Sequence, residues 1–179
     1  MRVLIDVDGC IANWLQGFLR EYNRIVRPTR PVLLSDMIGC PWNMWDHTDI
    51  ELDGKPVLDS AFRGEVSQAV SRTGFPLALK EYAGSVYSVR RILRTHDAYF
   101  VTAPNPVCYG WGSDRAEWLR ERFGSPRIVS TDQKHIVAGD ILIDDNHDTA
   151  GRWAQEQGGL AIVPPRQPDL RIFWRKTTR

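Results

Sequence analysis

The sequence has few cysteines, almost no net charge and no long apolar run. Its three cysteines show no paired metal-ligand spacing, and their odd number argues against a disulfide framework. We therefore expect reduced thiols and a cytoplasmic protein. The net charge of +1 excludes a broad basic surface, so we expect no stable nucleic-acid partner. The apolar stretch at the N-terminus is too short for a secretion signal or a membrane span, so no membrane partner is expected.

Short runs of β-forming residues alternate with segments of helical periodicity along the 179 residues. Runs of this length, bounded by polar, Gly or Pro residues, suit strands that are buried on both faces. The order predicts an α/β fold with a Rossmann-like, doubly wound parallel sheet. The expected strands are residues 3–7, 98–102, 127–130, 141–143 and 160–163.

The interval between the first two runs breaks this rhythm, because it is far longer than the roughly 30 residues of an ordinary βαβ unit. Residues 14–25 and 61–71 within it have helical patterns. We therefore expect a small, mainly helical cap at residues 16–80, inserted after the first strand. Residues 1–15 and 81–179 would then form the catalytic core.

Chemically active residues follow four of the expected strands, where ligands of an open parallel sheet bind. They comprise four carboxylates, one hydroxyl and one ammonium: Asp6, Asp8, Thr102, Lys134, Asp144 and Asp145. Clustered carboxylates repel one another, and a divalent cation relieves that repulsion. Hard oxygen ligands suit Mg²⁺, which can also screen an anionic phosphate as it approaches an anionic nucleophile.

This set of groups has the parts needed to hydrolyse a phosphomonoester. The Asp6 carboxylate can attack phosphorus and form an acyl phosphate. Asp8, two residues on, can protonate the leaving alkoxide and then activate water. Thr102 and Lys134 can hold the phosphoryl oxygens as charge develops.

Each residue also has a purely structural explanation when taken alone. A single DxD is common, Thr102 could cap a strand end, Lys134 could be a solvated lysine, and the acidic pair could cap the following helix. Four strand ends in the right order, each with the required group, are much more specific than any one part. Cys10 beside the nucleophile could be a packed small side chain or a redox-sensitive thiol.

The arrangement resembles the haloacid dehalogenase (HAD) superfamily of phosphohydrolases over nearly the whole chain. Its four motifs match the segment Asp6-Val7-Asp8-Gly9-Cys10, the hydroxyl of Thr102, the amine of Lys134 and the pair Asp144–Asp145. A narrower resemblance is to the 5'(3')-deoxyribonucleotidases. It rests on the stretches DVDGCIAN from Asp6, GFPLAL from Gly74, Thr102-Ala103-Pro104, and KHIVAGDILIDD from Lys134.

This resemblance implies specific roles. Asp6 would be the nucleophile and Asp8 the general acid and base. Mg²⁺ would be held by the Asp6 carboxylate, the Asp8 main-chain carbonyl and one acid of the following pair, with Asp144 favoured. Asp145 would then orient a water molecule or Lys134.

The resemblance also implies how the cap recognises its substrate. Trp14, eight residues after the nucleophile, would stack on the nucleobase. We expect Phe75, Trp42 and Trp45 to line the substrate site, although the two cap tryptophans could equally form the core of the cap. The sequence departs from the family in three places: Asn13 replaces an acid, Cys10 takes an apolar position beside the nucleophile, and Ala103 replaces a serine that contacts phosphate. A backbone N–H at Ala103 could still serve.

The sequence therefore predicts a Mg²⁺-dependent phosphatase of nucleoside monophosphates, favouring deoxyribonucleotides. The alternatives are a phosphatase of another small phosphorylated metabolite or of a nucleic-acid 3' end, a haloalkanoic acid dehalogenase, and a non-catalytic phosphate-binding domain. A closing cap favours small substrates, and the intact acidic motif argues against a non-catalytic domain. Whether the chain forms a homodimer stays open.

Overall fold

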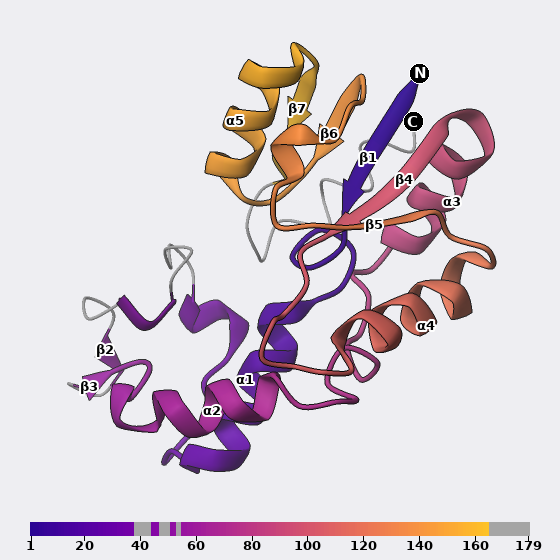
Figure 1. The fold of residues 1–179 in the computed structure, drawn as a ribbon. Helices are drawn as coiled ribbons and strands as arrows, with labels where there is room; N and C mark the ends of the chain where they lie inside the picture. The colour runs from indigo at the N-terminus through magenta and orange to yellow at the C-terminus, as the bar shows by residue number, and fades with distance from the viewer. Residues whose placement is uncertain (38–43, 47–50, 53–54, 165–179) are drawn as a thin grey trace.

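A five-stranded parallel sheet forms the core of the computed structural model, which describes residues 1–37, 44–46, 51–52 and 55–164 (Figure 1). The strand order is β5-β4-β1-β6-β7, and every neighbouring pair is parallel. The strands are β1 (Arg2–Asp6), β4 (Asp97–Thr102), β5 (Ile128–Ser130), β6 (Ile141–Ile143) and β7 (Leu160–Ile162). The predicted parallel α/β sheet is confirmed, with strand ends within about a residue of the expected ones.

Strand β1 lies at the centre of the sheet because its apolar side chains cover both faces. Successive side chains of a strand point to opposite faces. Val3 and Ile5 belong to the larger core cluster, whereas Leu4 belongs to a smaller cluster with Trp153. The outer strands differ from expectation: β5 and β7 are only partly buried, because each pairs on one side alone.

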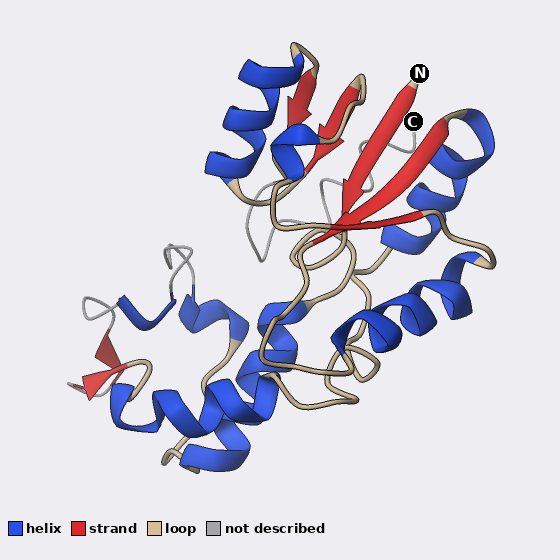
Figure 2. Cartoon of the chain, in the orientation of Figure 1, coloured by secondary structure: helices blue, strands red, loops and turns tan. Residues whose placement is uncertain are grey.

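Helices cover both faces of this sheet (Figure 2). Helices α3 (Ser85–Thr95) and α4 (Trp111–Phe123) contribute Val89, Trp118 and Leu119 to the larger cluster. Helix α5 (His147–Gln157) packs on the other face through Trp153. The start of α5 is capped by Asn146, whose side-chain oxygen accepts two backbone N–H bonds.

The segment inserted between β1 and β4 is mainly helical. It contains α1 (Trp14–Val26), α2 (Arg63–Val70) and the 3₁₀ turns η1 (Leu34–Met37), η2 (Met44–Asp46) and η3 (Ser60–Phe62). A short antiparallel pair, β2 (Glu51–Leu52) and β3 (Lys55–Pro56), was not predicted. Helix α1 is capped by Asn13, whose side chain accepts the Gln16 N–H. The helix runs without a break across the expected core–cap boundary at residue 16.

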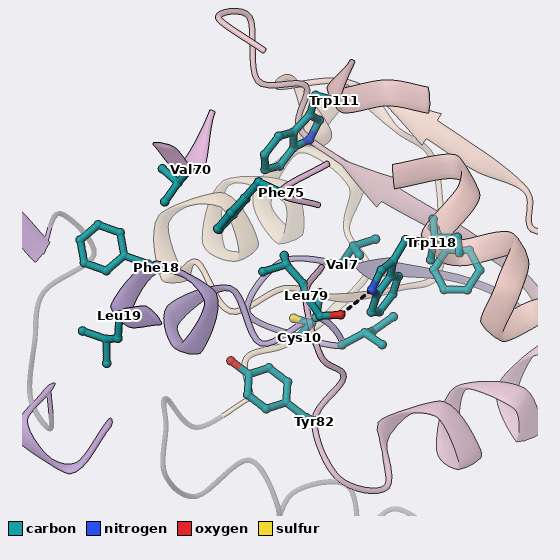
Figure 3. Close-up of a cluster of buried hydrophobic side chains, with 14 of the residues drawn as sticks. Val7, Cys10, Phe18, Leu19, Val70, Phe75, Leu79, Tyr82, Trp111 and Trp118 are labelled. Atoms are coloured by element: carbon teal, nitrogen blue, oxygen red, sulfur yellow. Dashed lines mark hydrogen bonds between the residues drawn. The ribbon is translucent and has the colours of Figure 1, made fainter. Parts of the chain in front are cut away.

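The inserted segment is joined to the rest of the fold by apolar contacts and by hydrogen bonds. Phe75, Leu79, Tyr82 and Trp118 belong to the same cluster as the cap residue Phe18 (Figure 3). The indole Nε1 of Trp118 donates to the Leu79 main-chain oxygen at 2.8 Å. The segment that returns from the cap is thus fixed to α4. Within the described residues, no helix is long and apolar enough to cross a membrane.

The smaller core cluster provides a test of stability. Trp153 is fully buried, and its Nε1 donates to the Val137 main-chain oxygen at 2.8 Å. We expect Trp153→Ala to lower the free energy of unfolding by about 3–5 kcal/mol, because it leaves a large cavity and an unpaired carbonyl. Tyr87 is 63% exposed, so Tyr87→Ala should change the free energy of unfolding by less than about 0.5 kcal/mol. Urea unfolding measures the free energy of unfolding of both variants. Equal losses in the two variants would contradict this description of the core.

Candidate active site

Asp6 ends strand β1 and is 4% exposed, at the carboxyl edge of the central strand. The chain then turns sharply, because the Val7 carbonyl accepts hydrogen bonds from the amides of both Ile11 and Ala12. Gly9 lies in this turn with φ +81°, a conformation that glycine adopts without strain. A Cβ at Gly9 would overlap the Asp145 carboxylate, so the turn and that acid are closely packed.

Lys134 joins the ends of two strands. Its Nζ lies 2.7 Å from Oδ1 of Asp6 and 2.8 Å from Oδ2 of Asp144, and the lysine is 8% exposed. It belongs to the 3₁₀ turn η4 (Lys134–Ile136), in the connection between β5 and β6. The structure therefore brings Asp6, the lysine and the acidic pair to one edge of the sheet.

The two adjacent acids differ in their contacts, and the metal-ligand role favoured for Asp144 by the sequence stays a prediction. Asp144 is fully buried and binds Lys134, and its Oδ1 accepts the Asn146 N–H at 2.9 Å. Asp145 instead has a carboxylate oxygen within 4.8 Å of ligand atoms of Asp6 and Cys10. Asp144 thus orients the lysine, and Asp145 lies beside Asp6.

Burial and mutual repulsion disfavour the charged forms of these acids. Burial raises the pKa of Asp6 to about 7, and Asp144 adds to the increase, although Lys134 opposes it. The pKa of Asp145 is raised well above its usual value by burial and then by Asp6 and Asp144. For Lys134, burial alone would lower the pKa, but the carboxylates of Asp6 and Asp144 outweigh it and raise the pKa.

The donor set beside Asp6 fits a hard divalent cation. Oδ1 of Asp145 is buried and has no hydrogen-bond partner among the described residues. A buried carboxylate oxygen without a partner is costly, so a positive ligand there would be favourable. Cys10 is fully buried, and burial raises the pKa of its thiol, so it stays protonated and is a poor ligand. The oxygens of Asp6 and Asp145 are the donors that suit Mg²⁺.

Thr102 places a second unsatisfied group at the same edge. Strand β4 pairs with β1 so that Val101 lies opposite Asp6, and Thr102 follows at the strand end. The Thr102 side-chain oxygen is buried without a hydrogen-bond partner among the described residues. Ala103, the next residue, is exposed and carries only a methyl group. A ligand oxygen at this edge could accept from the threonine hydroxyl and a backbone amide.

Arg115 of α4 is a charged group near Asp8 that sequence patterns alone did not single out. Its Nη2 lies 2.5 Å from Oδ1 of Asp8, and the arginine is 1% exposed. The spacing of Trp111, Arg115 and Trp118 follows one helical face. The sequence signal for this residue was a charged arginine on the same helical face as two tryptophans, which indicates a buried charge with a specific partner.

The aromatic residues of the cap differ in how accessible they are. Trp14 is half-buried, stacks against Phe18 at a centroid distance of 5.4 Å and meets Phe75 edge-on at 6.4 Å. Phe75 is only 1% exposed, so it supports Trp14 instead of offering a face to a ligand. Trp45 packs against Phe18 with their ring centroids 5.6 Å apart, within the aromatic core of the cap. Trp42 lies outside the described residues.

Curated relatives resemble most of the chain. The human protein named mitochondrial 5'(3')-deoxyribonucleotidase is 29% identical over 184 residues, covering 93% of this chain and 76% of the relative. The human cytosolic type of 5'(3')-deoxyribonucleotidase is 26% identical over 160 residues, covering 85% of this chain and 74% of the relative.

Solved structures with the same fold are hydrolases of the haloacid dehalogenase-like family. One from Streptococcus pneumoniae has a TM-score of 0.56 at 12% identity and covers 97% of this chain and 90% of its own. One from Xanthomonas campestris has a TM-score of 0.55 at 13% identity and covers 99% of this chain and 94% of its own. These likenesses confirm the HAD-like core. The sequence profile of the 5' nucleotidase, deoxy (pyrimidine), cytosolic type C protein family matches residues 1–158, and the chain belongs to this family.

Proposed function

We propose that this protein is a Mg²⁺-dependent phosphomonoesterase that hydrolyses nucleoside monophosphates, with deoxyribonucleotides preferred. The observation that carries the proposal is the ion-paired cluster at the carboxyl edge of the sheet, where Lys134 bridges Asp6 and Asp144. The family and the names of the curated relatives support a nucleotide as the substrate. A cytoplasmic location stays a prediction, since those relatives include both a mitochondrial and a cytosolic protein.

Asp6 is the nucleophile of the proposed reaction. Its Oδ1 contacts Lys134, which fixes the plane of the carboxylate and favours its charged form. A lysine ammonium has three donors, and two of them are directed to Asp6 and Asp144. The third can bind a phosphoryl oxygen. Together with the Thr102 hydroxyl, it would stabilise the charge that develops on the transferring group.

Asp8 is the general acid and base. Its side chain is 25% exposed, so it lies closer to solvent than Asp6. As the Asp6 oxygen bonds to phosphorus, the bond to the nucleoside oxygen breaks and Asp8 gives that oxygen its proton. The Asp8 carboxylate then accepts a proton from water, whose oxygen attacks the aspartyl phosphate. Inorganic phosphate leaves, and both Asp6 and protonated Asp8 are restored.

We assign the Mg²⁺ ligands to the carboxylates of Asp6 and Asp145 and to the main-chain carbonyl of Asp8. This assignment follows from the unpartnered Asp145 oxygen and from the bond that directs Asp144 to the lysine. When bound, Mg²⁺ neutralises charge on the phosphoryl group and between the two acids. The family pattern is compatible with either acid, and the hydrogen bonds that Asp144 accepts from Lys134 and Asn146 support Asp145 as the ligand.

Trp14 is the residue proposed to recognise the base. It is half-buried at the start of α1, and one face rests on Phe18 while Phe75 supports its edge. An indole fixed in this way can stack on a nucleobase with little loss of side-chain entropy.

Removing the nucleophile should stop turnover. An amide cannot form the acyl phosphate, so we expect Asp6→Asn to lower kcat by at least about a thousandfold. Glu117→Gln, at an exposed position of α4, should leave kcat unchanged and serves as the matched control. Phosphate release from a deoxynucleoside 5'-monophosphate measures the effect. Activity in a folded Asp6→Asn protein near that of the control would exclude the covalent mechanism.

Metal binding should depend on pH in a direction set by Asp6. Because its pKa of about 7 in the folded state lies above the usual value, folding takes up a proton between these two values. Without Mg²⁺, the free energy of unfolding should therefore fall as pH rises from about 4 to about 7. Mg²⁺ competes with that proton, so it should raise Tm more at pH 8 than at pH 6.

The same thermal measurement tests the ligand assignment. Asp145→Asn should remove most of the increase in Tm produced by Mg²⁺, whereas Asp148→Asn, at an exposed position of α5, should keep it. A full increase in the Asp145→Asn protein would show that this acid is not a ligand.

A substrate panel tests the proposed substrate class and the role of Trp14. We expect nucleoside 5'- and 3'-monophosphates to be hydrolysed with higher kcat/KM than sugar phosphates. Trp14→Ala should lower kcat/KM for nucleotides by about 5- to 150-fold, the equivalent of about 1–3 kcal/mol of stacking, and leave p-nitrophenyl phosphate nearly unchanged. Equal losses on both substrates would exclude base stacking at this residue, and a preference for sugar phosphates would exclude a nucleotidase.

A further inference from the structure

Arg115 is a buried charge with an unusual environment. Its Cζ lies 5.4 Å from the ring centroid of Trp111 and 5.5 Å from that of Trp118, so the guanidinium lies near two indole rings. Its Nε and Nη1 are buried and have no hydrogen-bond partner among the described residues. Within that part of the chain its one ion pair is to Asp8. A buried guanidinium needs hydrogen-bond acceptors, and Oδ1 of Asp8 accepts one of its N–H bonds.

The turn of α4 that carries Arg115 is held firmly in place. The neighbouring residue, Asp114, accepts the backbone N–H of Gly74 at 2.5 Å. One turn further, Trp118 donates to the Leu79 main-chain oxygen. Both bonds go to the segment that returns from the cap to α3. The position of the guanidinium is thus set by elements outside the turn that carries Asp8.

Asp8 is less constrained than the other acids of the site. It lies on the turn after β1, its side chain is 25% exposed, and rotation about its side-chain bonds would move the carboxyl group. The contact with Arg115 holds Oδ1 and leaves Oδ2 as the oxygen that can carry the proton. General acid–base catalysis depends on this geometry, because the proton moves only over a hydrogen-bond distance.

We propose that Arg115 is a positioning residue that fixes the Asp8 carboxyl group for proton transfer to the leaving group and from water. This role rests on the proposed phosphomonoesterase function. Arginine stays protonated throughout, so Arg115 exchanges no proton itself. In the first step the proton passes from Asp8 to the nucleoside oxygen as the P–O bond breaks, and in the second it passes from water to Asp8.

Two other roles for Arg115 predict different kinetics. A purely structural arginine would, when removed, lower the activity on every substrate along with stability. An arginine that binds the phosphoryl group directly would affect all phosphomonoesters alike. A positioning role affects substrates according to their leaving group. The nucleoside alkoxide needs a proton, whereas p-nitrophenolate is weakly basic and leaves without one.

The experiment compares kcat/KM for a deoxynucleoside 5'-monophosphate and for p-nitrophenyl phosphate, because kcat/KM reports steps up to the first irreversible one. We expect Arg115→Met to lower kcat/KM by about 30- to 100-fold for the nucleotide and by less than about fivefold for p-nitrophenyl phosphate. Arg115→Lys should recover most of the loss, since it retains a cation. Arg120→Met, at an exposed position of the same helix, is the matched control and should change neither value.

A double variant completes the test. If Arg115 acts through Asp8, then Asp8→Asn combined with Arg115→Met should lose no more nucleotide activity than Asp8→Asn alone. Equal losses on the two substrates, or multiplied losses in the double variant, would overturn the positioning role. If Arg115→Met does not fold, Arg115→Gln, which also lacks the positive charge, is judged by the same ratio between substrates. If the unsubstituted protein has no phosphomonoesterase activity, the proposed function is overturned as well. If that protein is active and Arg115→Met leaves the ratio of kcat/KM between the two substrates unchanged, only the role of Arg115 is overturned.

Discussion

The site depends on one buried ammonium group placed between two carboxylates. Lys134 lies within 2.8 Å of both Asp6 and Asp144, which end or directly follow the neighbouring central strands β1 and β6. Without this cation, two buried acids at adjacent strand ends would repel each other and take up protons. Lys134 offsets part of that repulsion but not all, because Asp145 adds a third carboxyl group whose pKa is raised. The clustered carboxyl groups at this edge of the sheet are the basis of the proposal that a divalent cation binds there.

The elements that the sequence predicted well are those in which local and long-range requirements agree. Strand β1 is apolar at Val3, Leu4 and Ile5, and both of its faces are covered, so its composition and its place at the centre have one cause. Residues at strand ends could be grouped from the sequence alone, because parallel strands deliver their carboxyl ends to one edge. This covers Asp6, Thr102 and the acidic pair.

Side-chain direction within the loops was not predictable in the same way. Asp144 and Asp145 are adjacent and chemically identical, and their places differ through the hydrogen bonds that Asp144 accepts from Lys134 and from the Asn146 amide. Phe75 fitted a substrate site by sequence, yet packing against α1 buries it, and that packing depends on how the cap folds back. The importance of Arg115 depends on a contact between α4 and the turn after β1, separated by 107 residues. Such contacts are set by tertiary packing.

The central place of β1 also governs how the enzyme can be made. Its partners in the sheet come much later in the chain, since Arg2 pairs with Asp97 and Val3 pairs with Ile141. At about 5–20 residues per second, a ribosome needs several seconds to proceed from the first strand to β6. Until then the apolar strand that ends at Asp6 lacks at least one neighbour and is exposed to aggregation. Folding of the sheet is therefore completed late, and a nascent chain that stops before β6 would lack Asp144 and Asp145.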